Sequence, residues 1–396
     1  MKINVAVIYG GKSTEHEVSV ISALQAIENM DKDKYNVIPV YMDKLGDFYI
    51  SKEELLFDSK NYSDIKNLKS KCIKVTFVKD NNKTYLREIK KSLFGGQYEI
   101  LIDVAFPIVH GTNVEDGNLQ GYLHTLNLPV VGPDCLAGAV SMDKYVTKAY
   151  LKSVGIPGIE ALRFDINDYN DIDNLINKVE KEIGYPVIVK PVNLGSSIGI
   201  KKASDKKSLM DALELAFSFA NVVLVEKAIT NMREINCAVL GDKLNCECSA
   251  LEEPFGNDEI LSFADKYMSG SKGGTGSKGG VKTASKLGGG AKGGMASLKR
   301  KVPADIDENK ANEIKEYAKK AFKYIGLSGV SRLDFIIDKD TNKVYLNEIN
   351  PIPGSLSFYL FEPIGLKYRD LLDRLINIAI DEFKKTEKLI YGKMFR

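Results

Sequence analysis

The sequence contains no tryptophan and only three histidines and five cysteines among its 396 residues. The cysteines are odd in number and scattered, and they show no metal-ligand spacing, so we expect buried thiols. No apolar run reaches about 18 residues, the length that a membrane span requires. The opening stretch, MKINVAVIYGG, lacks the apolar core and cleavage site of a signal peptide. We therefore expect a cytoplasmic protein without a membrane partner.

An excess of charge of one sign is also missing. Lysine and arginine total 55 against 53 aspartate and glutamate residues, a formal net charge of +2. This balance does not indicate a nucleic-acid partner. The chain is long and 44% hydrophobic, which predicts several globular domains. We expect two or three domains from the length, and the order of elements divides the chain into regions at residues 1–132, 133–230 and 231–396, the first an α/β unit with a parallel sheet.

The first region opens with an apolar strand from Ile3 to Ile8, followed by Gly10-Gly11 and a helix from about Glu17 to Asn29, which Ser13 or Thr14 is placed to cap. Such a turn directs backbone N–H groups and a helix dipole above the sheet and favours an anionic ligand. Further strands are expected at about 37–42, 73–78 and 100–109, and a helix at 118–125.

A polar, glycine-bounded loop, HGTNVEDG, follows the last of these strands at residues 110–117. Open α/β sheets bind ligands at the carboxyl ends of their strands, so this loop is a candidate part of a site. Taken alone, it could equally be an ordinary surface loop, and Glu15 could simply complement the helix dipole.

In the second region, a helix contains Asp143-Lys144, and an apolar strand from Val187 to Pro191 carries Lys190 into the loop NLGSSIG at 193–199. A lysine that feeds a glycine- and serine-rich loop supplies a charge and several donors for phosphates. The spacing is not that of a Walker loop, and the signal is weak by itself. The strand from Val222 to Glu226 is expected to form the opposite wall of this phosphate-binding site.

In the third region, residues 330–354 read as a β-hairpin with its turn at 338–342. Leu333, Phe335 and Ile337 share one face of the first arm, and Val344, Leu346, Glu348 and Asn350 are expected to share one face of the second. Asp334 then falls opposite Glu348, and Arg332 lies near Asn350. Opposed carboxylates require a cation, and oxygen ligands favour magnesium. The alternative is a solvated hairpin face.

Residues 270–294 hold eleven glycines and five lysines without one acidic residue. Such a composition cannot bury enough apolar surface to fold alone. We expect a lid over the site at 268–301, entered through Lys266 and Tyr267, although a tolerated surface insertion is the alternative.

Eight motifs together resemble the D-alanine–D-alanine ligases of the ATP-grasp superfamily. In chain order they are GGKSTEHEVS, HGTNVEDGNLQG, MDK, VIVKPVNLGSSIG, LVEKAI, KY, RLDF and NEINPIPG. The resemblance covers nearly the whole chain and implies a three-domain ATP-grasp fold that joins two D-amino acids through an acyl phosphate for peptidoglycan synthesis. It also implies ATP, two Mg²⁺ ions, for which Mn²⁺ could substitute, and a possible homodimer through the N-terminal domain.

Residue by residue, the resemblance implies the following site. ATP is bound by Lys144, Lys190, Ser196, Ser197, Lys227, Glu226 and Glu234, the two glutamates lining the adenosine pocket. The metals are held by Asp334, Glu348 and Asn350, and the oxyanion is stabilised by Arg332 and the Gly354 backbone. The substrates meet Glu15, His110, Lys266, Tyr267, Tyr359 and Leu360, and Glu15, Ser196 and Tyr267 form one hydrogen-bonded contact between domain and lid.

Two departures concern the acceptor. The glycine–lysine lid is longer than the loop usual in the family. Leu356 and Tyr359 replace a threonine and a serine, of which the serine helps bind the carboxylate of the second substrate. We therefore keep three hypotheses: a D-alanine–D-alanine ligase or one with D-serine or D-lactate as acceptor, an ATP-grasp ligase for another carboxylate and amine, and a non-catalytic nucleotide- or polyanion-binding protein.

Overall fold

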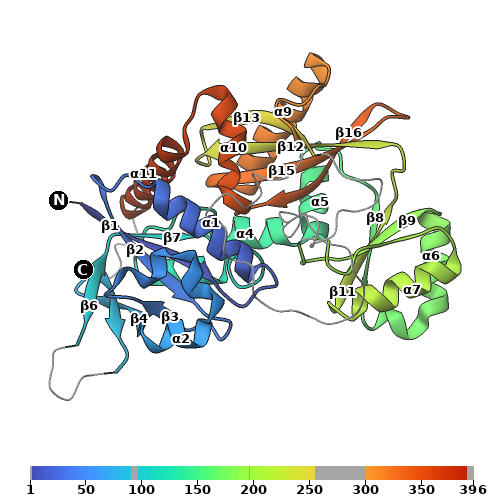
Figure 1. Ribbon diagram of the computed structural model, residues 1–396. Coiled ribbons are helices and arrows are strands. Elements are labelled where there is room, and N and C mark those ends of the chain that lie inside the picture. The colour runs from blue at the N-terminus through green and yellow to red at the C-terminus, as the bar shows by residue number, and fades with distance from the viewer. Residues whose placement is uncertain (1, 91–96, 196, 255–299, 390–396) are drawn as a thin grey trace, which may run out of the picture.

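The computed structural model describes residues 2–90, 97–195, 197–254 and 300–389. Predictions for Ser196, Lys266, Tyr267, the segment 270–294 and nearly all of the lid fall outside these residues. The described chain forms three sheets (Figure 1), with the N-terminal sheet at the left, the second at the right and the third above them. No helix within these ranges is long and apolar enough to span a membrane.

The N-terminal sheet is mixed, with strand order β6-β5-β4-β3-β2-β1-β7. Only β1 (Ile3–Gly10), β2 (Tyr35–Met42) and β7 (Val104–Pro107) are parallel neighbours. The remaining strands extend the sheet in antiparallel fashion: β3 (Phe48–Ile50), β4 (Ile73–Asp80), β5 (Lys83–Glu88) and β6 (Glu99–Ile102). The α/β class is confirmed, and its parallel part is limited to three strands.

The predicted continuous strand at 100–109 is wrong. The chain breaks at Asp103, whose carboxylate accepts a hydrogen bond from the Asn4 N–H at 2.8 Å. On its two sides, β6 pairs with β5 and β7 pairs with β1, so the segment forms two strands with different neighbours.

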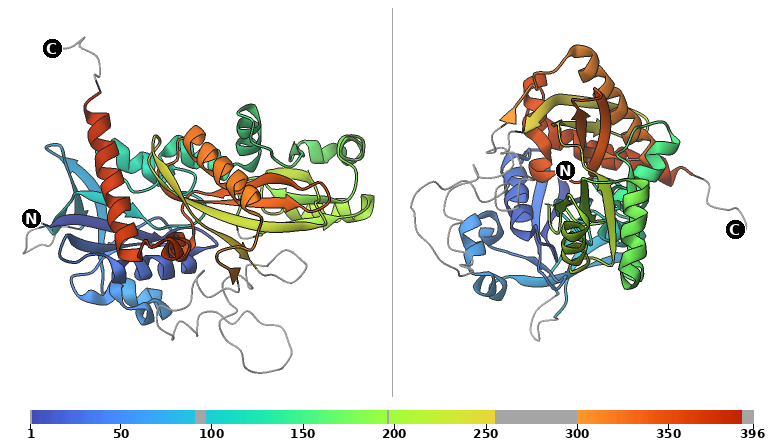
Figure 2. Two further views of the ribbon diagram at one scale, coloured as in Figure 1. Left: turned by 90° about the horizontal axis from the view of Figure 1, so that it is seen from above. Right: turned by 90° about the vertical axis from the view of Figure 1, so that its right-hand side faces the viewer.

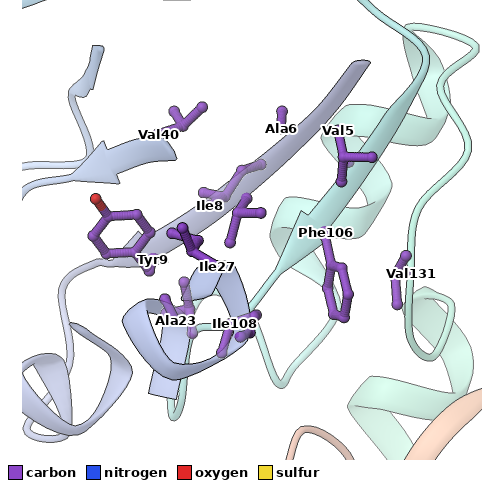
Figure 3. Close-up of a cluster of buried hydrophobic side chains, with 14 of the residues drawn as sticks. Val5, Ala6, Ile8, Tyr9, Ala23, Ile27, Val40, Phe106, Ile108 and Val131 are labelled. Carbon is purple, nitrogen blue, oxygen red and sulfur yellow. The ribbon is translucent and has the colours of Figure 1, made fainter. Parts of the chain in front are cut away.

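The N-terminal core is completed by the end of the chain. Val5, Ile8, Ile27 and Phe106 form its centre (Figure 3), and α1 (His16–Asn29) covers it. Its other helical elements before residue 130 are η1 (Glu54–Phe57), η2 (Ser59–Ser63), α2 (Ile65–Ser70) and α3 (Asn118–Thr125). The cluster also includes buried residues of η5 (Gly354–Ser357), α10 (Phe358–Phe361) and α11 (Tyr368–Glu387), which are joined by η6 (Glu362–Ile364). The views from above and from the side show α11 lying along this unit (Figure 2).

The second sheet has the order β10-β9-β11-β8 and is antiparallel throughout. It is built from β8 (Ala161–Asp165), β9 (Val187–Pro191), β10 (Lys201–Ala203) and β11 (Val222–Lys227), with η3 (Asp168–Asp171), α6 (Ile172–Glu182) and α7 (Lys206–Phe217) packed beside it. Apolar residues from these strands and helices form a separate core.

The third sheet has the order β14-β13-β12-β15-β16. Its strands are β12 (Met232–Gly241), β13 (Cys246–Pro254), β14 (Arg300–Lys301), β15 (Gly329–Asp338) and β16 (Lys343–Asn350), and α9 (Glu308–Ile325) packs on one face. Ala137 of α4 (Cys135–Met142) and Leu151 of α5 (Lys144–Ser153) belong to the same core. These two helices therefore pack with the third sheet, although they precede the strands of the second sheet in the sequence.

Candidate active site

The turn after β1 needs both of its glycines. Gly10 and Gly11 have φ of +97° and +83°, and a Cβ on Gly10 would lie 2.3 Å from the Met42 carbonyl oxygen. The expected capping of α1 by Ser13 or Thr14 is wrong, because Glu15 occupies the N-cap position without a side-chain cap bond. Ser13 instead accepts a hydrogen bond from the Glu15 N–H at 3.0 Å.

Glu15 lies between two loops from different units. Its carboxylate oxygen Oε2 is 3.6 Å from the positions that a Cβ on Gly111 or on Gly195 would occupy. The side chain is buried at 8% exposure. The structure therefore brings Glu15, the 110–117 loop and the glycine–serine loop together, as the sequence predicted, while its contact with Ser196 and Tyr267 stays a prediction.

His110 holds the backbone that precedes Gly354. Its Nδ1 donates to the Ile352 carbonyl oxygen at 2.8 Å, and its Nε2 lies 3.1 Å from the Ser22 hydroxyl. Burial lowers the pKa of His110, so the ring is neutral and Nε2 accepts from Ser22. The same hydroxyl accepts from the Ser355 N–H at 3.0 Å. His110 thus acts on a backbone segment in the described structure.

Glu115 holds the same segment from the other side. Its two carboxylate oxygens accept from the Gly111 N–H at 2.6 Å and from the Ile352 N–H at 3.3 Å. Burial and the neighbouring Glu15 carboxylate raise the pKa of Glu115 to about 8. The backbone N–H and the backbone C=O of Ile352 are therefore both held by the 110–117 loop.

These contacts support an unusual backbone. Ser355, Leu356 and Ser357 each have a φ of 50°, a region that non-glycine residues seldom occupy. Leu356 is 2% exposed and packs in the N-terminal core, as does Leu360 at 0%. The Leu360 side chain therefore lies in the core, where it offers a substrate no side-chain surface.

The predicted phosphate lysines lie in a buried cluster. Lys144, the first residue of α5, donates to the Leu194 carbonyl at 2.7 Å and lies 3.6 Å from a Glu348 carboxylate oxygen. Lys190 lies 2.8 Å from Glu226 Oε2, and Lys148 lies 3.2 Å from Glu226 Oε1. Burial alone would raise the Glu226 pKa, but the two lysines hold it below its ordinary value.

Other predicted nucleotide residues lie apart from this cluster. The Lys227 ammonium donates to the carbonyls of Ile183, Gly184 and Tyr185 at 3.4, 3.2 and 3.0 Å, near the end of α6. Glu234 is exposed on β12, opposite Ile336. Ser197 adopts a φ of 59° in the glycine–serine loop. Their predicted roles toward ATP stay predictions.

The hairpin register is as expected, with Asp334 opposite Glu348 and Arg332 opposite Asn350. The expected face of the second arm is wrong, because a β-bulge follows Asp334 and leaves Asn347 as the extra residue. Val344 and Leu346 therefore enter the core, whereas Glu348 and Asn350 share the face of Asp334. Asn347 accepts a hydrogen bond from Lys190 at 3.4 Å.

A polar row crosses the third sheet on this face. Register pairs Glu252 of β13 with Asn236 of β12, Asn236 with Asp334 of β15, and Asp334 with Glu348 of β16. Arg332 pairs with Asp334 through two contacts of 2.7 Å, and the Asn350 amide lies 3.0 Å from Asp334. Burial raises the pKa of Asp334, although Arg332 opposes this shift.

These donors fit magnesium in kind. Asp334, Glu348 and Asn350 present carboxylate and amide oxygens, which Mg²⁺ prefers over softer ligands. Within the described residues, no group of three or more His, Cys, Asp and Glu side chains could hold a metal ion. The predicted site, two carboxylates and an amide, is therefore a partial set that substrate oxygens have to complete.

At the β13 and β14 end of this polar row, Glu252 is paired with an arginine. The Arg300 guanidinium lies 2.7 Å from Glu252 Oε1 and 4.1 Å from the centre of the Tyr359 ring, and the Tyr359 hydroxyl is 3.4 Å from Glu252 Oε2. Burial and the Glu252 carboxylate raise the pKa of Tyr359 to about 12. Tyr359, which the sequence predicted to face the acceptor, is therefore neutral and held by this pair.

Sequence reasoning missed several residues of the site: Ser22, Glu115, Lys148, Asn236, Glu252, Arg300 and Asn347. Lys148 had a signal, because it lies one helical turn after Lys144 in the same helix. Glu115 had one as well, inside the motif HGTNVEDG. The other five depend on long-range pairing, which no local pattern reveals.

Two family models match the chain. One, D-ala D-ala ligase N-terminus, matches residues 4–133, and the other, D-ala D-ala ligase C-terminus, matches residues 150–285 and 292–377. The D-alanine–D-alanine ligase of Thermosipho melanesiensis is 38% identical, with 96% of this chain and 95% of that protein aligned. That of Caldicellulosiruptor bescii is 37% identical, with 99% of each aligned.

Solved structures agree with these matches. The D-alanine–D-alanine ligase from Coxiella burnetii superposes with a TM-score of 0.76 at 28% identity, covering 98% of this chain and 96% of that one. The VanG D-Ala:D-Ser ligase from Enterococcus faecalis gives 0.74 at 29% identity, covering 96% and 100%. These matches define the class of the protein as an ATP-dependent ligase with the ATP-grasp fold. The chain belongs to the D-alanine–D-alanine ligase family.

Proposed function

We propose that this protein joins two D-alanine molecules into D-alanyl-D-alanine at the expense of ATP, through an acyl phosphate, in cytoplasmic peptidoglycan precursor synthesis. The observation that carries the proposal is the meeting of the lysine cluster and the carboxylate row, where Lys144 lies 3.6 Å from Glu348. An anionic phosphate chain and its metal ions require these two kinds of side chain next to each other.

The residues divide the chemistry among themselves. Lys144 and Lys190 bind phosphate oxygens, and Glu15 accepts hydrogen bonds from the ammonium group of the first D-alanine. Asp334, Glu348 and Asn350 would hold magnesium, which would supply positive charge toward the phosphoryl group. Arg332 and the Gly354 N–H donate to the oxyanion that forms when the second amino acid attacks. The lid and a homodimer through the N-terminal unit remain part of this proposal.

A second candidate differs only in the acceptor. Tyr359 stands at the position of the motif NEINPIPG and its continuation where the family usually has a serine, and a cation, Arg300, stacks on its ring. A larger and charged wall changes which acceptor fits, and D-serine or D-lactate then competes with D-alanine.

One experiment tests both candidates. The purified protein is supplied with MgATP and D-alanine, alone and then with D-serine or D-lactate, and phosphate release and the mass of the product are measured. We expect D-alanyl-D-alanine as the main product. A mixed product in the second assay establishes the altered acceptor, and the absence of ATP turnover in every assay overturns the ligase proposal.

A further inference from the structure

Lys148 is a buried charge to which the mechanism above gives no task. It lies on α5 one turn after Lys144, and its side chain is 8% exposed. Its aliphatic stem passes Gly158, where a Cβ would lie 3.6 Å from Lys148 Cγ. Its ammonium lies 3.2 Å from Glu226 Oε1. A side chain in this position acts on its neighbour Glu226 and makes no contact with bulk solvent.

Glu226 is shared by two lysines. Its second oxygen lies 2.8 Å from the Lys190 ammonium, and the Lys190 and Glu226 side chains are 6% and 3% exposed. Lys190 is therefore engaged inside the protein in the described structure. Its ammonium also donates to Asn347 at 3.4 Å. To give its full charge to a phosphate oxygen, Lys190 therefore has to weaken its pairing with the Glu226 carboxylate.

When Lys190 weakens this pairing, Glu226 loses one of its two cations. A buried carboxylate without a cation is strongly unfavourable, so the departure of Lys190 is opposed unless another cation stays. Lys148 is that cation, because it contacts the other oxygen of the same carboxylate. We propose that Lys148 is a positioning residue that keeps Glu226 neutralised and thereby releases Lys190 to the phosphates of ATP. This inference rests on the function proposed above.

The first test is direct binding of MgATP by calorimetry, without amino acids, together with steady-state kinetics. We expect K148M to bind MgATP about tenfold more weakly or worse, the effect of one charged hydrogen bond that has to be broken. The KM for ATP rises by the same factor, and the KM for D-alanine does not change. K148R keeps the charge and retains most of the affinity. K152M, on the exposed side of the same helix, behaves as the wild type.

The decisive comparison uses Glu226. If Lys148 acts only by neutralising Glu226, it becomes dispensable in E226Q, and K148M/E226Q binds MgATP as well as E226Q does. The proposal is overturned if K148M weakens MgATP binding in the E226Q background as much as it does in the wild type. It is also overturned if K148M binds MgATP with wild-type affinity. The pair also serves if K148M fails to fold, since the double variant removes one lysine and one carboxylate together and so keeps the net charge of the cluster. A wild-type protein that binds MgATP but makes no dipeptide argues against the proposed function alone.

Discussion

The two charged regions of the site carry an excess of charge of opposite sign. In the lysine cluster, Lys148 and Lys190 contact one buried carboxylate, Glu226, and Lys144 donates to the Leu194 carbonyl. In the polar row, three carboxylates (Glu252, Asp334 and Glu348) meet two arginines, Arg300 and Arg332. Each region is partly neutralised by its own side chains, and each has one sign of charge left over. The first is therefore suited to an anion and the second to a cation.

Removal of Asp334 should have the largest effect on this comparison. D334N deletes one metal-binding carboxylate and leaves the buried Arg332 without its partner. We expect kcat/KM to fall on the order of 10³-fold and Mn²⁺ binding, measured by calorimetry, to be lost. D340N, at the exposed turn of the same hairpin, is the control. Undiminished metal binding in D334N would show that the row is not a cation site.

Glu252 tests the outer end of the row. The Arg300 and Glu252 side chains are 9% and 3% exposed. E252Q removes the carboxylate that lies 2.7 Å from this buried guanidinium and should lower the free energy of unfolding by about 3 kcal/mol. Denaturant unfolding measures this change. The neighbouring Glu253 pairs with Arg233 at 2.7 Å, with side chains 18% and 29% exposed. E253Q should cost less than about 1 kcal/mol, and equal costs would contradict the role given to burial.

Glu115 is a buried carboxyl group that accepts hydrogen bonds from two backbone N–H groups, and burial raises its pKa. Its folded pKa is raised to about 8, above the unfolded value, so its contribution to stability is complete below pH 4.5 and is lost as pH rises toward 8. The free energy of unfolding should therefore decrease by about 3 kcal/mol between pH 5 and pH 8. E115Q should remove this slope. An identical slope in both proteins would refute the shift.

The smallest effect should come from neutral hydrogen bonds. S22A removes the acceptor of the Ser355 N–H and the partner of His110. We expect about 1 kcal/mol of lost stability and a several-fold fall in kcat with the KM for ATP unchanged. Ser63, exposed in η2, provides the control S63A. If S22A changed only the KM for ATP, Ser22 would act on nucleotide binding, as the lysine cluster does, and this prediction would be wrong.

The sequence predicted the hairpin pairing because alternation and a polar turn define a register. It could not predict the bulge at Asn347, since an extra residue changes which side chains share a face without changing the composition of the strand. The lysine at the end of β9 was recognisable from its glycine–serine loop, but its pairing with Glu226 depends on how β9 and β11 align. Ser22 and Ser355 are 333 residues apart, a distance over which local patterns carry no information.

The shared N-terminal core has a consequence for how the chain reaches its working state. Strands β1, β2 and β7 leave the ribosome early, but part of the core that they bury against comes from η5 to α11. The first unit therefore cannot finish packing until synthesis is nearly complete. The hydrogen bonds that shape the backbone at 352–355 form in the same late event. A chain that stops before Ile352 thus lacks both part of its N-terminal core and the backbone segment that His110 and Glu115 hold.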